Sequence, residues 1–301
     1  MAISSAIRLS DRTYLQLRAF AWVAAGLVVC FGPILVQLGR FAIKTDFDSY
    51  LLLVPAIAVG MVFLAWKKDV GYSDPNRALA AGLAIAGIAA LGFSWVAGNS
   101  GGAWTANWLT LATLSFVLLL AGVTAWFLGR QMLSRVSFPL GFLICMVPLP
   151  ASLTADFEYL LQHSSASVAN VGFQVSDLPV FRPGDLEFQL PGITLMVAPE
   201  CSGIQSTVAL FIVSLAAGYV FLRSPWKRAL LSLAVIPLGI LRNAVRIVTI
   251  GELCVHIGPD MINSYIHRKG GWIFFLVALV PFLALLLFFA QSEHPLSKGK
   301  N

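Results

Sequence analysis

Three side chains that could perform nucleophilic chemistry stand beside long apolar stretches of this chain. Cys201 lies directly before one such stretch, Arg246 lies near the end of the next, and His267 precedes the last. A thiol attacks carbonyl carbon, an imidazole transfers protons, and a guanidinium stabilises a developing oxyanion. If the fold brings these groups to one face of a membrane, the sequence predicts a cysteine-nucleophile site with Cys201, Arg246 and His267 as its catalytic residues.

The residues around Cys201 suit a nucleophile. If a helix begins near Ser202, its unpaired amides and the positive end of its dipole favour a thiolate at its start. Gly203 allows close backbone approach, so free amides there could also hold an oxyanion. Glu200 could tune the site, although a solvated loop carboxylate is the simpler interpretation. Cys254 is predicted on the same face as Cys201, so a disulfide between the two is the structural alternative.

Arg246 is expected near the membrane surface, about 25 Å along its span at 1.5 Å per residue. Charges at such depth are costly unless they face a polar cavity, so a functional role is the default hypothesis. Asn243 shares a helix face with Arg246 and could orient its guanidinium. Arg242 lies one turn deeper, where a structural ion pair or a snorkelling side chain is the alternative interpretation. His256 competes with His267 for the role of base.

The composition places these residues in a membrane protein. The 301 residues are 58% hydrophobic and only 11% charged, far more apolar than a soluble domain of average composition. A helix needs about 20 apolar residues to cross the hydrocarbon core of a bilayer. We therefore predict an all-α polytopic integral membrane protein, a single membrane domain over 1–301 with about eight transmembrane helices, two of them short. The spans are expected at residues 17–39, 50–66, 78–97, 107–128, 136–150, 203–222, 229–250 and 271–290.

Lys and Arg residues predict the orientation of these spans. They gather near both termini and in alternate loops, at 67–77, 130–135 and 223–228. Cytoplasmic loops carry an excess of Lys and Arg. Both termini are therefore predicted on the cytoplasmic side of a cytoplasmic (inner) membrane, and the active site on its extracytoplasmic face. The net charge of +6 then reflects membrane lipid and topology, with no case for nucleic acid. Neither a CxxC pair nor a Cys/His cluster at zinc spacing occurs, so no metal and no cofactor is expected.

Residues 151–202 form the longest break in the hydrophobic pattern and fall outside in this topology. The first half predicts a helix lying in the membrane interface. The apolar face of that helix would hold Leu153, Phe157, Leu160, Leu161 and Val168. The second half alternates apolar and polar residues around Pro191-Gly192, which predicts a small hairpin. We expect these elements to form an extracytoplasmic cap between spans five and six.

Three ordered sequence blocks resemble those of the exosortase/archaeosortase family of polytopic membrane cysteine transpeptidases. The first is the Cys-Ser-Gly block, formed here by Cys201, Ser202 and Gly203 after Glu200. The second is the N-x-x-R block, with Asn243 and Arg246. The third is the H-x-x-x-G-W-x-x-F block, with His267, Gly271, Trp272 and Phe275. The resemblance covers roughly residues 135–290.

The resemblance implies that Cys201 attacks a peptide bond near the C-terminus of an exported protein, while Arg246 stabilises the oxyanion and His267 handles protons. Supporting roles would fall to Asn243, Ser202, Gly203 and Glu200. The cleaved sorting signal would be PEP-CTERM-like: a short motif, a transmembrane helix and a basic cluster. The acyl-enzyme would then be resolved by an amine acceptor, giving transfer, or by water, giving proteolysis.

Two other classes of membrane protein remain open. A small-solute membrane transporter would explain Arg242 and Arg246, but it predicts inverted repeats or paired broken helices, and the sequence has no such symmetry. A membrane scaffold or assembly factor would explain the spans. It would not explain a Cys, an Arg and a His that converge on one face.

Overall fold

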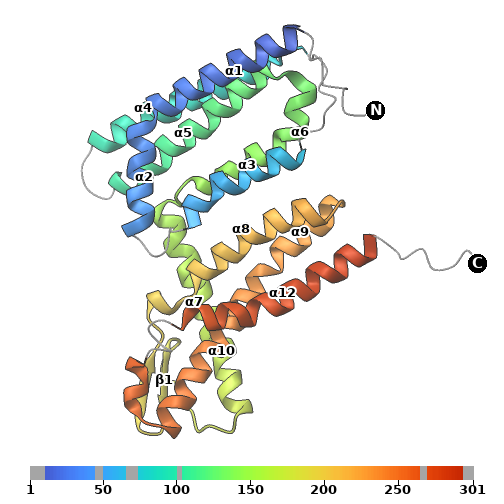
Figure 1. Cartoon of the computed structure of the whole chain (residues 1–301). Helices are drawn as coiled ribbons and strands as arrows, with labels where there is room; N and C mark the ends of the chain where they lie inside the picture. Colours follow the sequence, from blue (N-terminus) through green and yellow to red (C-terminus); the bar gives the residue numbers. More distant parts are fainter. Residues whose placement is uncertain (1–10, 45–49, 66–73, 100–103, 265–269, 294–301) are drawn as a thin grey trace, which may run out of the picture. The chain divides into compact units, whose positions relative to one another are not determined.

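The computed structural model describes residues 11–44, 50–65, 74–99, 104–264 and 270–293. Most of these residues are helical, and several helices are long and apolar, so the prediction of an all-α polytopic membrane protein is confirmed. The chain divides after Ala151 into two compact units, which are described separately (Figure 1).

The described residues contain five to seven candidate membrane spans. Five helices are long and apolar enough to cross a bilayer, and two bent helix pairs raise the number to seven if each pair is one span. The five are Arg77–Gly98, Asn107–Phe127, Ile204–Phe221, Pro225–His256 and Gly271–Glu293. The predicted count of about eight is not confirmed, because it also requires the shorter apolar helix Tyr50–Ala65.

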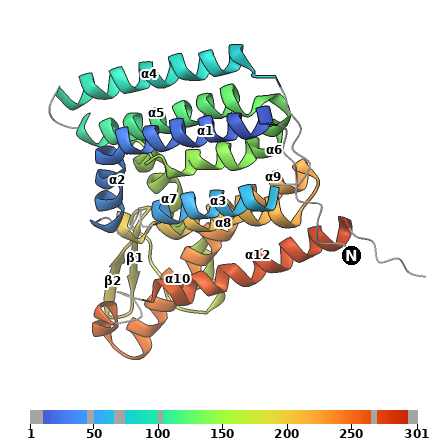
Figure 2. The same ribbon diagram turned by 45° about the horizontal axis from the view of Figure 1, so that its top comes forward.

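The first unit is a group of helices. Its elements are α1 (Asp11–Cys30), α2 (Gly32–Lys44), α3 (Leu53–Ala65), α4 (Arg77–Asn99), α5 (Trp104–Phe127), α6 (Gly129–Phe142) and the 3₁₀ helix η2 (Leu143–Met146). Helices α4 and α5 run side by side in both views (Figures 1 and 2). A Cβ at Gly122 of α5 would lie 3.3 Å from the Ala80 carbonyl oxygen of α4. Glycine therefore lets these two helices approach backbone to backbone, as is common in membranes.

The predicted continuous span over 17–39 is bent in the structure. Helices α1 and α2 meet at an angle of 61° at Phe31. Pro33 follows the break at the second position of α2. Because proline has no amide hydrogen to donate and disfavours helical geometry in the residue before it, the helix cannot continue straight through this point.

The predicted span over 136–150 lies earlier in the chain than expected. Helix α6 begins at Gly129, and the helical segment ends with η2 at Met146. Pro148 and Pro150 follow directly. Two prolines this close together end a helix, because neither can supply an amide hydrogen to the turn before it.

The second unit carries the predicted site. Its elements are α7 (Ala151–Val175), β1 (Glu187–Leu190), β2 (Ile193–Met196), η3 (Pro199–Cys201), α8 (Ile204–Phe221), α9 (Pro225–Leu233), α10 (Val235–His256), η4 (Pro259–Asn263) and α12 (Gly271–Glu293). Strands β1 and β2 pair antiparallel, with Glu187 opposite Met196 and Leu190 opposite Ile193. Gly192 occupies the turn with φ +79°, a conformation that favours glycine.

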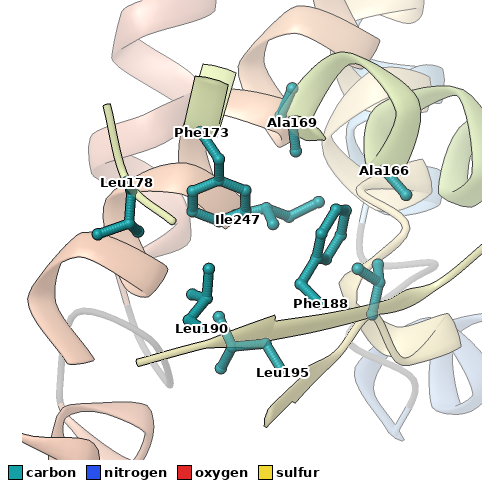
Figure 3. Packing of buried hydrophobic residues seen from close by; sticks show 10 residues of the cluster. Ala166, Ala169, Phe173, Leu178, Phe188, Leu190, Leu195 and Ile247 are labelled. Atoms are coloured by element: carbon teal, nitrogen blue, oxygen red, sulfur yellow. The ribbon is translucent and has the colours of Figure 1, made fainter. Parts of the chain in front are cut away.

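A small hydrophobic core joins the hairpin to α7 and α10 (Figure 3). The rings of Phe173 from α7 and Phe188 from β1 meet edge to face with centroids 5.4 Å apart. We call the buried cluster the cap core. It consists of Ala166, Ala169, Phe173, Leu178, Phe188, Leu190, Leu195, Val197, Ala244 and Ile247. Cys201 is one of the partly buried residues packed against it.

Helix α7 packs against the protein through small and polar residues, while most of its predicted apolar face stays exposed. Of the five apolar residues expected on one face, Leu161 is buried, while Leu153, Phe157, Leu160 and Val168 are 38–50% exposed. The buried face instead carries small and polar residues, among them Gln162, Ser165, Ala166 and Ala169. Large apolar side chains can face lipid, and small side chains allow close packing of helices, so the usual rule of apolar residues inside is relaxed here.

The far end of α8 is fixed by an acidic residue of α12. The Glu293 carboxylate accepts backbone hydrogen bonds from Arg223 at 2.6 Å and Ser224 at 2.9 Å, and lies 3.6 Å from Lys227 Nζ. Since α8 has 18 residues, this basic end lies about 27 Å from the end that follows Cys201.

Candidate active site around Cys201

Cys201 is the last residue of a short 3₁₀ turn that connects β2 to α8. Its amide donates to the Ala198 carbonyl at 2.8 Å, and the Ser202 amide donates to the Pro199 carbonyl at 2.9 Å. Helix α8 begins at Ile204, two residues later than expected. Cys201 therefore lies before the helix and does not occupy its first position.

Gly203 joins the turn to the helix in the left-handed conformation, with φ +78°. A Cβ here would lie 2.5 Å from Arg242 Nη2 and 3.1 Å from Asn243 Cγ. Both the backbone conformation and the lack of space require glycine at this position.

Two adjacent residues of α10 contact the carbonyls around Cys201. Asn243 Nδ2 donates to the Cys201 carbonyl at 2.8 Å, and Arg242 Nη2 donates to the Gly203 carbonyl at 3.4 Å. Both residues are buried: Asn243 has no exposed surface, and Arg242 is 5% exposed. These contacts bring the first two sequence blocks together in space.

The role predicted for Asn243 differs from the contact observed. Asn243 was expected to orient the Arg246 guanidinium, yet its side-chain oxygen accepts no hydrogen bond in the described structure. Its side chain reaches across to the turn that carries Cys201. A shared helix face therefore did not decide the hydrogen-bond partner of Asn243, because the segment packed against α10 offers an acceptor.

The hydroxyl groups near Cys201 organise the start of α8. Ser202 is 2% exposed, and its Oγ accepts a hydrogen bond from the Ile204 amide at 3.5 Å. Ser206 and Thr207 donate their hydroxyls to the Gly203 carbonyl at 3.1 and 2.9 Å. Ser202 thus supports the backbone of the turn.

The three predicted catalytic residues are described to different extents. Cys201 is half-buried, and Arg246 is half-buried one helical turn beyond Arg242 on α10. His267 lies outside the described residues, and so does the side chain of Glu200. The structure thus places Cys201 beside the helix that carries Arg246.

The alternatives to the predicted site can be compared directly. All four cysteines fall within the described residues and are free thiols, so Cys201 and Cys254 form no disulfide. His256 is exposed, and its Nε2 lies 3.0 Å from Glu252 Oε2 on the preceding turn of α10. Within the described ranges, no three His, Cys, Asp or Glu side chains are grouped as a metal site would need.

One residue that organises the site was missed by the sequence analysis. Gln162 of α7 is buried, and its Nε2 donates to the Val197 carbonyl in the segment between β2 and Cys201. A signal existed in the sequence, because Gln162, Ser165, Ala166 and Ala169 recur at helical spacing. In a membrane protein, such a stripe of small and polar residues indicates a packing face.

Comparison with known proteins gives one match. Residues 42–284 match the family described as transmembrane exosortase (Exosortase_EpsH), which covers more than half of the chain and includes all three sequence blocks. Neither the curated proteins nor the solved structures contain a significant match.

Proposed function

Because the chain belongs to the transmembrane exosortase family, we propose that it is a membrane-embedded cysteine endopeptidase or transpeptidase that cleaves the C-terminal sorting signal of exported proteins. Family membership supports a general role in membrane transpeptidation and protein sorting. The observation that carries the finer proposal is the hydrogen bond from Asn243 to the Cys201 carbonyl, because it joins the helix of Arg246 to the predicted nucleophile.

The proposed reaction uses each group for one task. The Cys201 sulfur attacks the scissile carbonyl carbon, and His267 accepts the thiol proton. The Arg246 guanidinium stabilises the negative oxygen of the tetrahedral intermediate. Collapse of this intermediate breaks the carbon–nitrogen bond, and His267 returns the proton to the leaving amine. A thioester remains on Cys201, and an amine acceptor or water then releases the product.

The proposed substrate is held in the same membrane as the enzyme. A tail with a short motif, a transmembrane helix and a basic cluster presents its scissile bond at the membrane surface, and confinement in the bilayer supplies much of the positioning. The proposal places Cys201 on the extracytoplasmic face. The basic segment 223–228 lies at the opposite end of α8, and Lys and Arg favour the cytoplasmic side. The partners would be exported proteins, membrane lipid and an amine acceptor.

Processing of a tail-bearing substrate tests the proposal. The full-length protein is co-expressed with an exported protein that carries the tripartite tail, and shortening of the substrate is followed on a gel. Cys201→Ala is expected to fold and to process nothing. Cys201→Ser is expected to be nearly as inactive, because a hydroxyl lacks the acidity of a thiol.

Cys30→Ala is the matched control, since Cys30 is an exposed thiol of α1. It is expected to process the substrate at the normal rate. Full processing by Cys201→Ala, at equal protein level, would show that the chain does not act as a cysteine transpeptidase.

A further inference from the structure

Arg242 and Asn243 are neighbours on α10, and each donates to a carbonyl of the nucleophile segment, defined here as residues 201–203. We propose that these two side chains are positioning residues that clamp the nucleophile segment and fix the backbone from which the Cys201 thiol is presented. The inference rests on the proposed function, because it concerns the same nucleophile. It gives Arg242 a role that neither an ion pair nor snorkelling describes.

Arg242 occupies a position that is unfavourable for its charge. It forms no ion pair with any carboxylate whose side chain the structure describes, and its Nε has no hydrogen-bond partner there. It contacts the start of α8, where the helix dipole is positive, and Arg246 follows four residues later on the same helix. The positive end of the α8 dipole and the Arg246 guanidinium both raise the free energy of the buried Arg242 cation. A charge retained in such a place indicates function more than stability.

The contact surface between α10 and the nucleophile segment leaves little room for movement. Gly203 is so close to α10 that a Cβ would collide with Arg242 and crowd Asn243. One turn earlier on α10, a Cβ at Gly239 would collide with the Thr207 side chain in the first turn of α8. The two donors therefore project from a helix that is itself packed tightly against the segment they hold.

The hydrogen bonds from α10 connect the nucleophile segment to a second element. The Cys201 and Ser202 amides donate only within the turn, to Ala198 and Pro199. The carbonyls of Cys201 and Gly203 accept from α10, so the segment is held at both ends. A misplacement of the reacting atoms by 1 Å can lower a rate by about a hundredfold, and a site held by rigid helices avoids this loss.

Three variants of the full-length protein test the clamp. Arg242→Gln removes the charge and shortens the side chain, and Asn243→Leu removes the donor to Cys201 without changing any charge. Each is expected to lower kcat for a tail-bearing substrate by about tenfold or more, with KM within about twofold of the normal value. Arg242→Lys is expected to retain most of kcat, because the observed contact uses a single N–H donor and lysine supplies one.

Hydrogen–deuterium exchange of the amides of residues 200–204 provides a readout that does not need activity. Loss of a clamp lowers the free energy of local opening, so these amides are expected to exchange about tenfold faster in Arg242→Gln and Asn243→Leu. Leu241→Ala and Val245→Ala are matched controls on the exposed face of α10, and both are expected to leave kcat and exchange unchanged.

Several results would overturn the clamp. They are normal kcat and normal exchange in Arg242→Gln and Asn243→Leu, a raised KM with unchanged kcat, or an Arg242→Lys variant as slow as Arg242→Gln. The melting temperature in detergent monitors folding, and if Arg242→Gln does not fold, Asn243→Leu and Arg242→Lys decide the question. Cys201→Ala is assayed in parallel. If it still processes the substrate, the proposed function fails, while the exchange measurement continues to decide the clamp.

Discussion

The side-chain amide of Asn243 donates a hydrogen bond to the carbonyl oxygen of Cys201 at 2.8 Å, across 42 residues of sequence. This contact joins two sequence blocks that composition and periodicity treat as unrelated. It also guides the choice of mutations, because it distinguishes the residues proposed to touch the substrate from those that hold the nucleophile in place.

Arg246→Lys is expected to lose most of its activity. Lysine keeps the positive charge but lacks the planar fork of donors that fits an oxyanion, so kcat should fall by about a hundredfold. The measurement is the rate of substrate shortening at matched protein level. Arg223→Lys is the control, because Arg223 is exposed and contacts Glu293 through its backbone amide. Near-normal activity of Arg246→Lys would show that Arg246 supplies only a positive charge.

His267→Ala and His256→Ala are expected to differ sharply. Loss of the proposed proton carrier should slow acylation and product release by about a hundredfold or more. His256 is exposed and paired with Glu252 on its own helix, so its replacement should leave the rate within about twofold of normal. Single-turnover assays of both variants distinguish them. If His256→Ala were slow and His267→Ala unimpaired, His256 and not His267 would be the proton carrier.

Labelling with an impermeant thiol reagent tests the orientation in the membrane. In a chain freed of its four cysteines, Asp185→Cys is expected to react from outside intact spheroplasts, because it lies in the cap. Lys298→Cys is expected to react only after lysis, since the basic end is predicted in the cytoplasm. Labelling of position 298 but not 185 in intact spheroplasts would contradict the predicted topology and would place Cys201 on the cytoplasmic face.

Gly251→Ala is expected to destabilise the cap. A Cβ at this position of α10 would lie 2.6 Å from Phe173 Cε1 and 3.0 Å from Leu190 Cδ1, two members of the cap core. Overpacking of this kind costs about 1–3 kcal/mol and should lower the melting temperature in detergent. Gly26→Ala in α1 is the control, because no atom lies within 4 Å of its added Cβ. Equal melting temperatures for the two variants would contradict the close packing of α10 against the cap core.

The family and the candidate nucleophile could be predicted from the sequence because both depend on local patterns. Long apolar runs identify membrane helices wherever they fall, since every backbone group in lipid must be paired within the helix. A cysteine, an arginine and a histidine beside such runs stand out because polar residues there are rare. The hairpin within 151–202 was likewise predicted by alternation and by Pro191-Gly192, and β1 and β2 are found there.

Only the tertiary structure decided which faces and partners these residues use. Helix α7 leaves exposed four of the five residues of its predicted apolar face and buries Gln162, because the environment of a helix in a membrane protein can be lipid or protein. Asn243 Nδ2 donates to the Cys201 carbonyl, and Asn243 Oδ1 accepts no hydrogen bond from Arg246. Periodicity records positions on one helix, whereas a contact across 42 residues depends on how two segments pack, and that packing is set by the whole unit.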